Sequence, residues 1–292
     1  MSSPSLFRVG LILTERCNVT CGHCWFSCGP DREATMTRGQ AEDIIDQARS
    51  LGARWVSFTG GEPFLEYRLL LGLVEYASGK GLYTEAVTNN SWAEDQRLAM
   101  DKLRPLVNAG LTAINMSVDD FHQEHVPLDS VRHCFEAAKA LNVKPVFMVA
   151  VKPGSRITAE SLPRLMGDPG IQVPGGPRLR SPSALAAETP FTPVGRGGEL
   201  AWAHVAVAQS YRCESVITDI GVKPDGDVLP CCGPLGCRGD AVIGNLGEDT
   251  LRDVLSRAWG DPRFTKIRVG FESGAGSAGR CHACYRLFGE DL

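Results

Sequence analysis

The sequence lacks the features of membrane-embedded, secreted and nucleic-acid-binding proteins. It contains no apolar run of membrane-spanning length and no run of five like charges. The amino terminus has no basic segment followed by an apolar stretch, which argues against a secretory signal. A net charge of −4 argues against a nucleic-acid partner. We therefore expect a cytoplasmic globular protein that binds neither nucleic acid nor a membrane.

Cysteine, by contrast, is abundant, with 11 residues among 292. Without a secretory signal, cysteines that cluster at ligand spacings indicate metal binding in a reducing compartment and not disulfides. The first cluster, Cys17-x3-Cys21-x2-Cys24, follows an expected strand at 7–14. Thiolates are the ligands of iron–sulfur clusters, and three of them leave one iron of a four-iron cluster open. A zinc site is the alternative, with His23 or Cys28 as the nearest fourth ligand.

A second motif, TGGEP at 59–63, directly follows an expected strand at 55–58. The cysteine triplet and this segment together resemble the signature of the radical S-adenosylmethionine (radical SAM) enzymes. The resemblance implies that SAM chelates the open iron of a [4Fe–4S] cluster. Reductive cleavage of SAM then gives a 5′-deoxyadenosyl radical that abstracts hydrogen from a substrate. It also implies an electron donor of the flavodoxin or ferredoxin type.

The first half of the chain alternates between expected strands and helices, which predicts an α/β fold with a parallel sheet. The motifs occur at the carboxyl ends of strands, where barrel enzymes carry their chemistry. The resemblance implies a partial (β/α)6 TIM-like barrel, which we assign to residues 1–200. Within it, a stretch dense in proline and glycine at about 152–198 predicts a loop-rich connector. The expected strands are 7–14, 55–58, 83–87, 113–118 and 146–151. The first expected helix begins at Thr37 with a capping box completed by Gln40, and its apolar residues fall on one face. The other expected helices span 69–76, 94–103 and 131–141.

Polar and glycine residues at these strand ends are the candidates for holding SAM. Glycines without a side chain permit a close backbone approach, and the other residues match positions where radical SAM enzymes contact the cofactor. For the residues at the ends of strands three and four, a role as helix caps or turn residues is an equally good reading. His122 is expected to cap its loop, with a proton shuttle as the alternative. The predicted cofactor-binding residues are His23, Gly60, Gly61, Glu62, Asn89, Ser117 and Asp119.

A second set of cysteines lies in residues 201–292. An Asp225-Gly226 turn between two apolar segments predicts a β-hairpin, and an amphipathic helix is expected to start near Asp249. This arrangement resembles the SPASM domain, and best its shortened twitch form, which holds one auxiliary [4Fe–4S] cluster. The resemblance implies four ligands, Cys213, Cys231, Cys281 and Cys284.

Cys232 and Cys237 are extra cysteines, which we expect to be spectators and not ligands. A zinc ribbon is the alternative for the whole set, because four cysteines in two groups also suit zinc. A third reading of the chain is accordingly a zinc-stabilised protein without catalytic activity.

The four-ligand auxiliary cluster predicts the reaction class. A cluster saturated by thiolates has no iron for substrate, so its expected role is to accept an electron after hydrogen abstraction. The architecture most resembles the twitch-type dehydrogenases of aminocyclitols, which predicts an oxidoreductase for an alcohol, sugar or aminocyclitol in biosynthesis. The alternative is a maturase that crosslinks or epimerises a ribosomal peptide. We expect the small molecule, because the first strand begins near Phe7 and leaves no room for a leader-binding domain.

The substrate-contacting residues are not indicated by any motif. Arg178, Arg180 and Arg196 lie in or beside the connector, where they would either bind anionic groups or be solvated.

Overall fold

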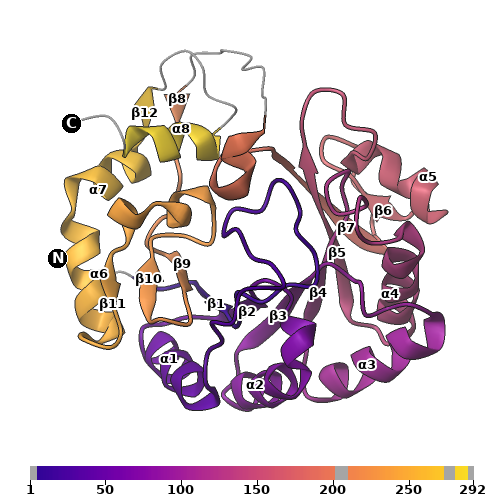
Figure 1. Cartoon of the computed structure of the whole chain (residues 1–292), viewed down its shortest axis with the longest axis horizontal. Coiled ribbons are helices and arrows are strands. Elements are labelled where there is room, and N and C mark those ends of the chain that lie inside the picture. The colour runs from indigo at the N-terminus through magenta and orange to yellow at the C-terminus, as the bar shows by residue number, and fades with distance from the viewer. Residues whose placement is uncertain (1–4, 201–209, 273–279, 289–292) are drawn as a thin grey trace.

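The computed structural model describes residues 5–200, 210–272 and 280–288, and its main feature is a ten-stranded sheet (Figure 1). The strand order is β11-β10-β9-β1-β2-β3-β4-β5-β7-β6, and β8 and β12 form a separate pair. The strands are β1 (Arg8–Ile12), β2 (Trp55–Thr59), β3 (Tyr83–Thr88), β4 (Ala113–Ser117), β5 (Lys144–Val151), β6 (Ile171–Gln172), β7 (Ala184–Pro190), β8 (Ser210–Tyr211), β9 (Asp219–Val222), β10 (Asp227–Leu229), β11 (Gly244–Asn245) and β12 (Phe271–Glu272).

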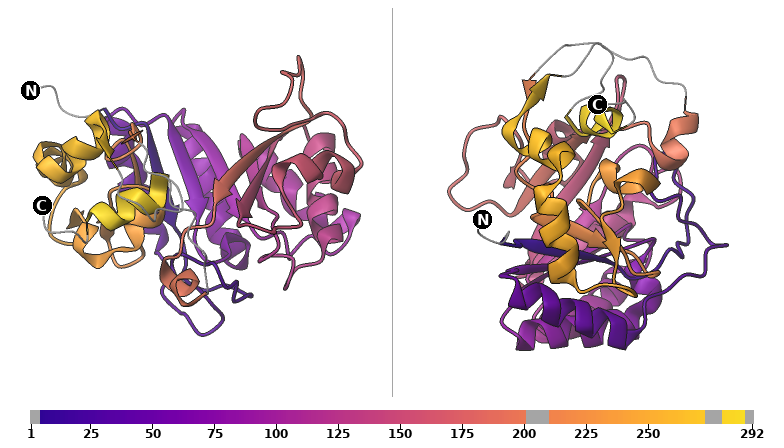
Figure 2. Two further views of the ribbon diagram at one scale, coloured as in Figure 1. Left: turned by 90° about the horizontal axis from the view of Figure 1, so that it is seen from above. Right: turned by 90° about the vertical axis from the view of Figure 1, so that its left-hand side faces the viewer.

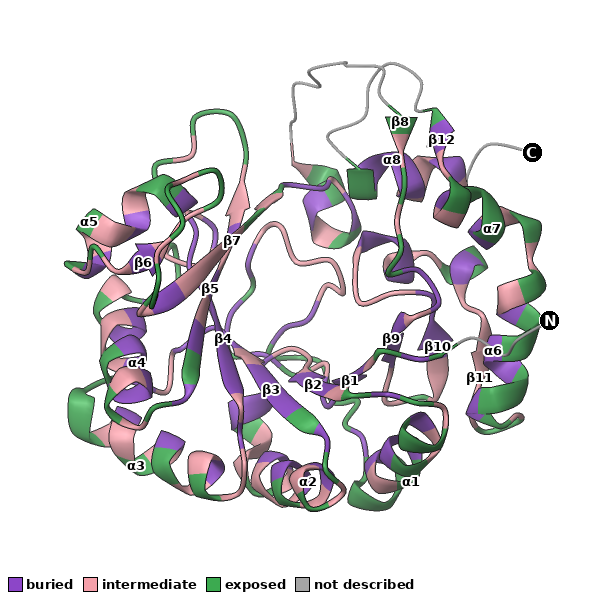
Figure 3. Ribbon diagram, turned by 180° about the vertical axis from the view of Figure 1, so that it is seen from behind, coloured by how far each residue is buried: buried purple, intermediate pink, exposed green. Residues whose placement is uncertain are grey.

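Helices α1 to α4 cover the outer face of the curved sheet (Figure 1), which confirms the expected barrel fold. The capping box predicted at Thr37 is present, because its side chain and that of Gln40 bond each other's backbone N–H groups. Burial follows the predicted apolar stripe of α1 (Figure 3). The α-helices are α1 (Arg38–Ser50), α2 (Tyr67–Gly79), α3 (Gln96–Asn108), α4 (Leu128–Ala140), α5 (Leu162–Met166), α6 (Leu251–Gly260), α7 (Pro262–Val269) and α8 (Arg280–Leu287).

The predicted loop-rich connector contains the sixth barrel strand, so that prediction was wrong for part of its length. Strand β7 pairs in parallel with β5, from Val146 opposite Leu185 to Val151 opposite Pro190. The segment ALAAETP has few of the β-branched and aromatic residues that mark strands, so its sequence carries little strand signal. The strand forms because β5 offers an open edge of hydrogen-bonding groups.

The predicted hairpin is present, and one of its strands also joins the barrel sheet. Strands β9 and β10 pair antiparallel through a turn in which Gly226 has a φ of +89°, a conformation that favours glycine. Strand β9 also pairs in parallel with β1, from Arg8 opposite Asp219 to Leu11 opposite Val222. The hairpin therefore extends the barrel sheet beyond β1.

The carboxyl-terminal elements share one apolar core with the barrel. Val9 and Leu11 of β1 belong to the same buried cluster as Leu255 of α6 and Phe264 of α7. The Leu251 N–H donates to Gln47 Oε1 at 2.7 Å and thereby joins α6 to α1. Figure 2 shows these orange and yellow helices beside the β1 edge of the barrel. The predicted boundary at 200/201 borders residues 201–209, which lie outside the described residues.

None of the helices in the described residues is both long enough and apolar enough to cross a bilayer.

Candidate active site

The cysteine triplet lies in the loop between β1 and α1, which folds back across the carboxyl end of the barrel. Cys17 and Cys21 are buried and Cys24 is half-buried. All three line one cavity of about 320 Å³, together with Gly60 and Gly61. The structure thus brings the two sequence motifs into one place.

The two glycines of the TGGEP segment let it pack directly on the cysteine loop. A Cβ on Gly60 would lie 2.4 Å from the Thr14 carbonyl oxygen, and one on Gly61 would lie 2.1 Å from that of Arg16. The Gly61 N–H donates to Thr14 O at 2.6 Å. The sequence predicted a close approach to a ligand at these positions, and the structure adds a close approach to the loop itself.

The thiols of the triplet suit a metal cluster. Burial raises the pKa of Cys17 to about 11 and that of Cys21 to about 12, so ionisation there depends on a cation. A hydrogen bond with the Cys28 thiol lowers the pKa of Cys24 to about 6. Cys28 is therefore a partner of the triplet and not an isolated thiol.

Arg196 holds the cysteine loop through hydrogen bonds to its backbone carbonyls. Its guanidinium donates to Cys21 O at 2.7 Å and to Cys28 O at 2.6 Å, and its backbone N–H donates to Cys24 O at 3.1 Å. Gly195, with a φ of +57°, packs so closely that a Cβ would lie 2.1 Å from Trp25 O. The guanidinium proposed as a substrate anchor is thus engaged with the loop, whereas Arg178 and Arg180 are exposed.

Glu62 and Asn89 link the TGGEP segment to the end of β3. The buried Glu62 carboxylate accepts hydrogen bonds from Phe64 N, Thr88 Oγ1 and Asn89 N. Burial raises the pKa of Glu62 to about 7. Glu62 thus holds the strand end behind the cavity, whereas Asn89 lines the cavity and its Nδ2 lies 3.7 Å from Cys17 Sγ.

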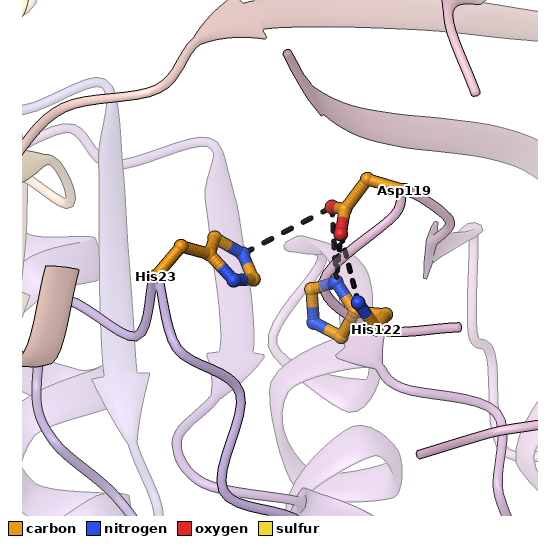
Figure 4. Close-up of side chains that lie close together, drawn as sticks. All are labelled: His23, Asp119 and His122. Carbon is orange, nitrogen blue, oxygen red and sulfur yellow. Dashed lines mark hydrogen bonds and ion pairs between the residues drawn. The ribbon is translucent and has the colours of Figure 1, made fainter. Parts of the chain in front are cut away.

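His23, Asp119 and His122 form a compact polar group at the same end of the cavity, which Ser117 also lines. Figure 4 shows both imidazoles turned toward the Asp119 carboxylate, with His122 Nδ1 at 2.9 Å and His23 Nε2 at 3.9 Å. Burial lowers the pKa of His23 to about 4, so the ring is neutral. His23 stacks on Phe121, with ring centroids 4.5 Å apart.

Asp119 caps this loop, because its Oδ1 accepts the backbone N–H of His122 at 2.9 Å. Burial lowers the pKa of His122, but the charge of Asp119 and its hydrogen bond outweigh that effect, and the pKa is raised. The cap that the sequence assigned to His122 is thus supplied by Asp119, which the His122 ring also contacts. The structure adds that His122 also lines the cavity.

The four cysteines of the second set come together from three places in the chain. Cys213 follows β8, Cys231 follows β10, and Cys281 and Cys284 are one turn apart on α8. Burial raises the pKa of Cys284, and negative charge on Cys231, Cys213 and Cys281 raises it further. These charge effects indicate that the four thiols lie within electrostatic range of one another. Their roles as ligands stay predictions.

Cys232 and Cys237 lie beside that set, because charge on Cys231 raises the pKa of both. Cys232 lines the barrel cavity, whereas Cys231 is not among its lining residues. The Cys232 thiol donates to Ile220 O at 3.0 Å. Cys237 lies between the two cysteine sets, because burial and negative charge on both Cys231 and Cys24 raise its pKa.

The fold and the two cysteine sites define a barrel enzyme with a cluster-binding extension. Residues 11–151 match the model of the radical SAM superfamily, and residues 213–285 match that of SPASM, an iron-sulfur cluster-binding domain. The chain is a radical SAM enzyme with a carboxyl-terminal SPASM domain. Its cofactors are a [4Fe–4S] cluster that binds SAM, an auxiliary cluster and SAM itself. When bound and reductively cleaved, SAM would supply a 5′-deoxyadenosyl radical for hydrogen abstraction.

Two relatives illustrate how far the similarity extends. The putative peptide biosynthesis protein YydG of Bacillus subtilis (strain 168) is 24% identical over 229 residues, which cover 77% of this chain and 69% of YydG. A GTP 3′,8-cyclase of Synechococcus elongatus is 32% identical over 133 residues, which cover 44% of this chain and 39% of the cyclase. The chain thus spans about two fifths of that cyclase.

Solved structures with 16% sequence identity share the fold. SuiB of Streptococcus suis bound to its precursor peptide SuiA has a TM-score of 0.56, covering 96% of this chain and 73% of SuiB. BtrN in complex with AdoMet and 2-DOIA has a TM-score of 0.52, covering 92% of this chain and 87% of BtrN. These likenesses extend across the barrel and the carboxyl-terminal region.

Proposed function

We propose that this enzyme abstracts a hydrogen atom from a substrate held in the barrel cavity and oxidises it by two electrons in total. One electron leaves with the hydrogen atom, and the second passes from the substrate radical to the auxiliary cluster. The observation that carries this proposal is the grouping of Cys213, Cys231, Cys281 and Cys284, which together would saturate that cluster. A flavodoxin or ferredoxin would supply the electron that cleaves SAM.

A small alcohol, sugar or aminocyclitol is the first candidate substrate. The fold shared with BtrN, whose structure holds 2-DOIA, supports this class by analogy, and so does the modest cavity. The residues for SAM would be Gly60, Gly61, Asn89 and Ser117, which all line that cavity. We also propose that the carboxyl-terminal domain is the twitch form.

A ribosomal peptide is the second candidate substrate. The putative peptide biosynthesis protein YydG matches 77% of this chain. SuiB was solved with its precursor peptide. In this case the cavity would receive one side chain or backbone carbon of the peptide, and the product would be a modified residue.

The reaction is tested with reduced, anaerobically prepared enzyme, SAM and substrates that carry deuterium at the reacting carbon. Mass spectrometry of 5′-deoxyadenosine then reports deuterium transfer from whichever class is the substrate. The variant Cys281→Ala/Cys284→Ala is expected to keep transferring deuterium while losing the oxidised product. Equal yields of oxidised product from wild type and this variant would contradict the proposal that the auxiliary cluster accepts the second electron.

A further inference from the structure

The barrel cavity continues past the cofactor end to a polar floor. In closed barrels the inner layers are filled by branched apolar side chains. Here the cavity wall at the same depth carries Ser57 on β2, Glu85 on β3 and Asn115 on β4. Ser57 and Glu85 are direct register partners, and Asn115 is opposite Val87, two residues along the same face. The three side chains therefore face one space from adjacent strands.

Two of these groups are buried without a partner. Ser57 is 6% exposed and Asn115 is 8% exposed, and within the described ranges neither side chain makes a hydrogen bond. Buried polar groups in proteins are nearly always hydrogen-bonded. Both side chains line the cavity, so the groups available to bond them are those of a molecule inside it.

The floor holds two opposite charges, because both Arg8 and Glu85 line the cavity. Arg8 Nη1 donates to Glu85 Oε1 at 2.9 Å, and the same guanidinium pairs with Asp219 of β9, which does not line the cavity. The three groups together carry one positive and two negative charges, a net charge of −1. Glu85 is 7% exposed, and its carboxylate has lone pairs left for further donors. The excess negative charge favours a cation over an anion beside Glu85.

From this arrangement we propose that Ser57, Glu85 and Asn115 bind a primary ammonium group of the substrate. An ammonium has three N–H donors and no acceptor. The hydroxyl, carboxylate and amide oxygens of these residues supply three acceptors. The amine enters first, so the rest of the substrate points back toward Ser117 and the SAM end. This inference rests on the proposed function and narrows it to amine-bearing substrates, whether a small molecule or a lysine-like side chain.

The test is equilibrium dialysis of radiolabelled n-butylamine against the reconstituted holoenzyme with SAM, with butan-1-ol and butanoate as probes of equal length. Saturable binding of butylamine, and none of butanoate, is expected. Glu85→Gln should weaken butylamine binding at least tenfold, and Ser57→Ala about threefold. Glu42→Gln removes a half-exposed α1 carboxylate, which pairs with Arg38, and should leave both butylamine binding and SAM cleavage unchanged.

Ser57→Ala removes only a hydroxyl, so it keeps the test decisive if Glu85→Gln fails to fold. Butylamine binding no tighter than that of butanoate, or unchanged in both variants, would overturn the site. SAM cleavage is measured on the same wild-type sample. Cleavage without amine binding refutes this site alone, whereas absence of cleavage refutes the proposed function.

Discussion

Gly10 shows how a single residue without a side chain makes room for the thiol of Cys232 in the cavity wall. It lies in the middle of β1, and a Cβ there would be 2.2 Å from Cys232 Sγ. The thiol occupies the space that a side chain at position 10 would fill. At this scale the cavity wall is set by contacts between β1 and the segment that follows β10.

Gly10→Ala is expected to cost about 1–3 kcal/mol in the free energy of unfolding, because the added methyl overpacks this contact. Removing the thiol as well, in Gly10→Ala/Cys232→Ala, should restore most of that loss. Thermal unfolding under anaerobic conditions measures both. Gly39→Ala is the matched control, since its Cβ would meet nothing within 4 Å, and α1 should tolerate it. A double variant as unstable as Gly10→Ala would contradict the predicted contact.

The conformation of the cysteine loop depends on a residue from a distant part of the chain. It contains no regular helix or strand, and its shape depends on Arg196, which is reached only after β7. Three hydrogen bonds from this residue end on the carbonyls of Cys21, Cys24 and Cys28. Residues nearly 170 positions later in the chain therefore shape the first cluster site.

Arg196→Gln should release the cysteine loop and speed the loss of iron to a chelator. Hydrogen bonds that involve a charged group contribute about 1.5–3 kcal/mol each, and 1.4 kcal/mol is a factor of ten. We expect iron loss to become roughly tenfold faster or more, followed by absorbance. Arg178→Gln removes an exposed arginine of the same region and is the control. Equal rates in the two variants would show that the loop does not need Arg196.

At the scale of the whole molecule, the sequence was most informative where chemistry requires particular residues. The structure confirms the Thr37 capping box, and the comparisons confirm the family and cofactors that the cysteine spacings and the TGGEP segment predicted. The roles of the single residues in these motifs stay predictions. Strand β7 could not be predicted, because its pairing with β5 and not its own composition makes it a strand. The polar floor was also missed, since Ser57, Glu85 and Asn115 come together only through sheet register.

Iron and acid-labile sulfide per chain test the two-site architecture. Two four-iron clusters predict about eight irons in wild type and about four in Cys281→Ala/Cys284→Ala. Cys232→Ala should still hold about eight, because that thiol faces the barrel cavity. About four irons in wild type, or stoichiometric zinc, would contradict the auxiliary cluster and favour the zinc ribbon.

The parallel pairing of β9 with β1 has a consequence for timing. Backbone hydrogen bonds fix the hairpin before Cys231 in register with the strand that leads to Cys17. Cys17 and Cys231, one cysteine of each set, thus follow strands of one continuous sheet. The rate of electron tunnelling falls steeply with distance. A fixed separation between the two cluster sites would therefore give a fixed rate of electron transfer. The overall rate of turnover would then be limited by the binding of substrate and SAM, and not by the docking of one domain on the other.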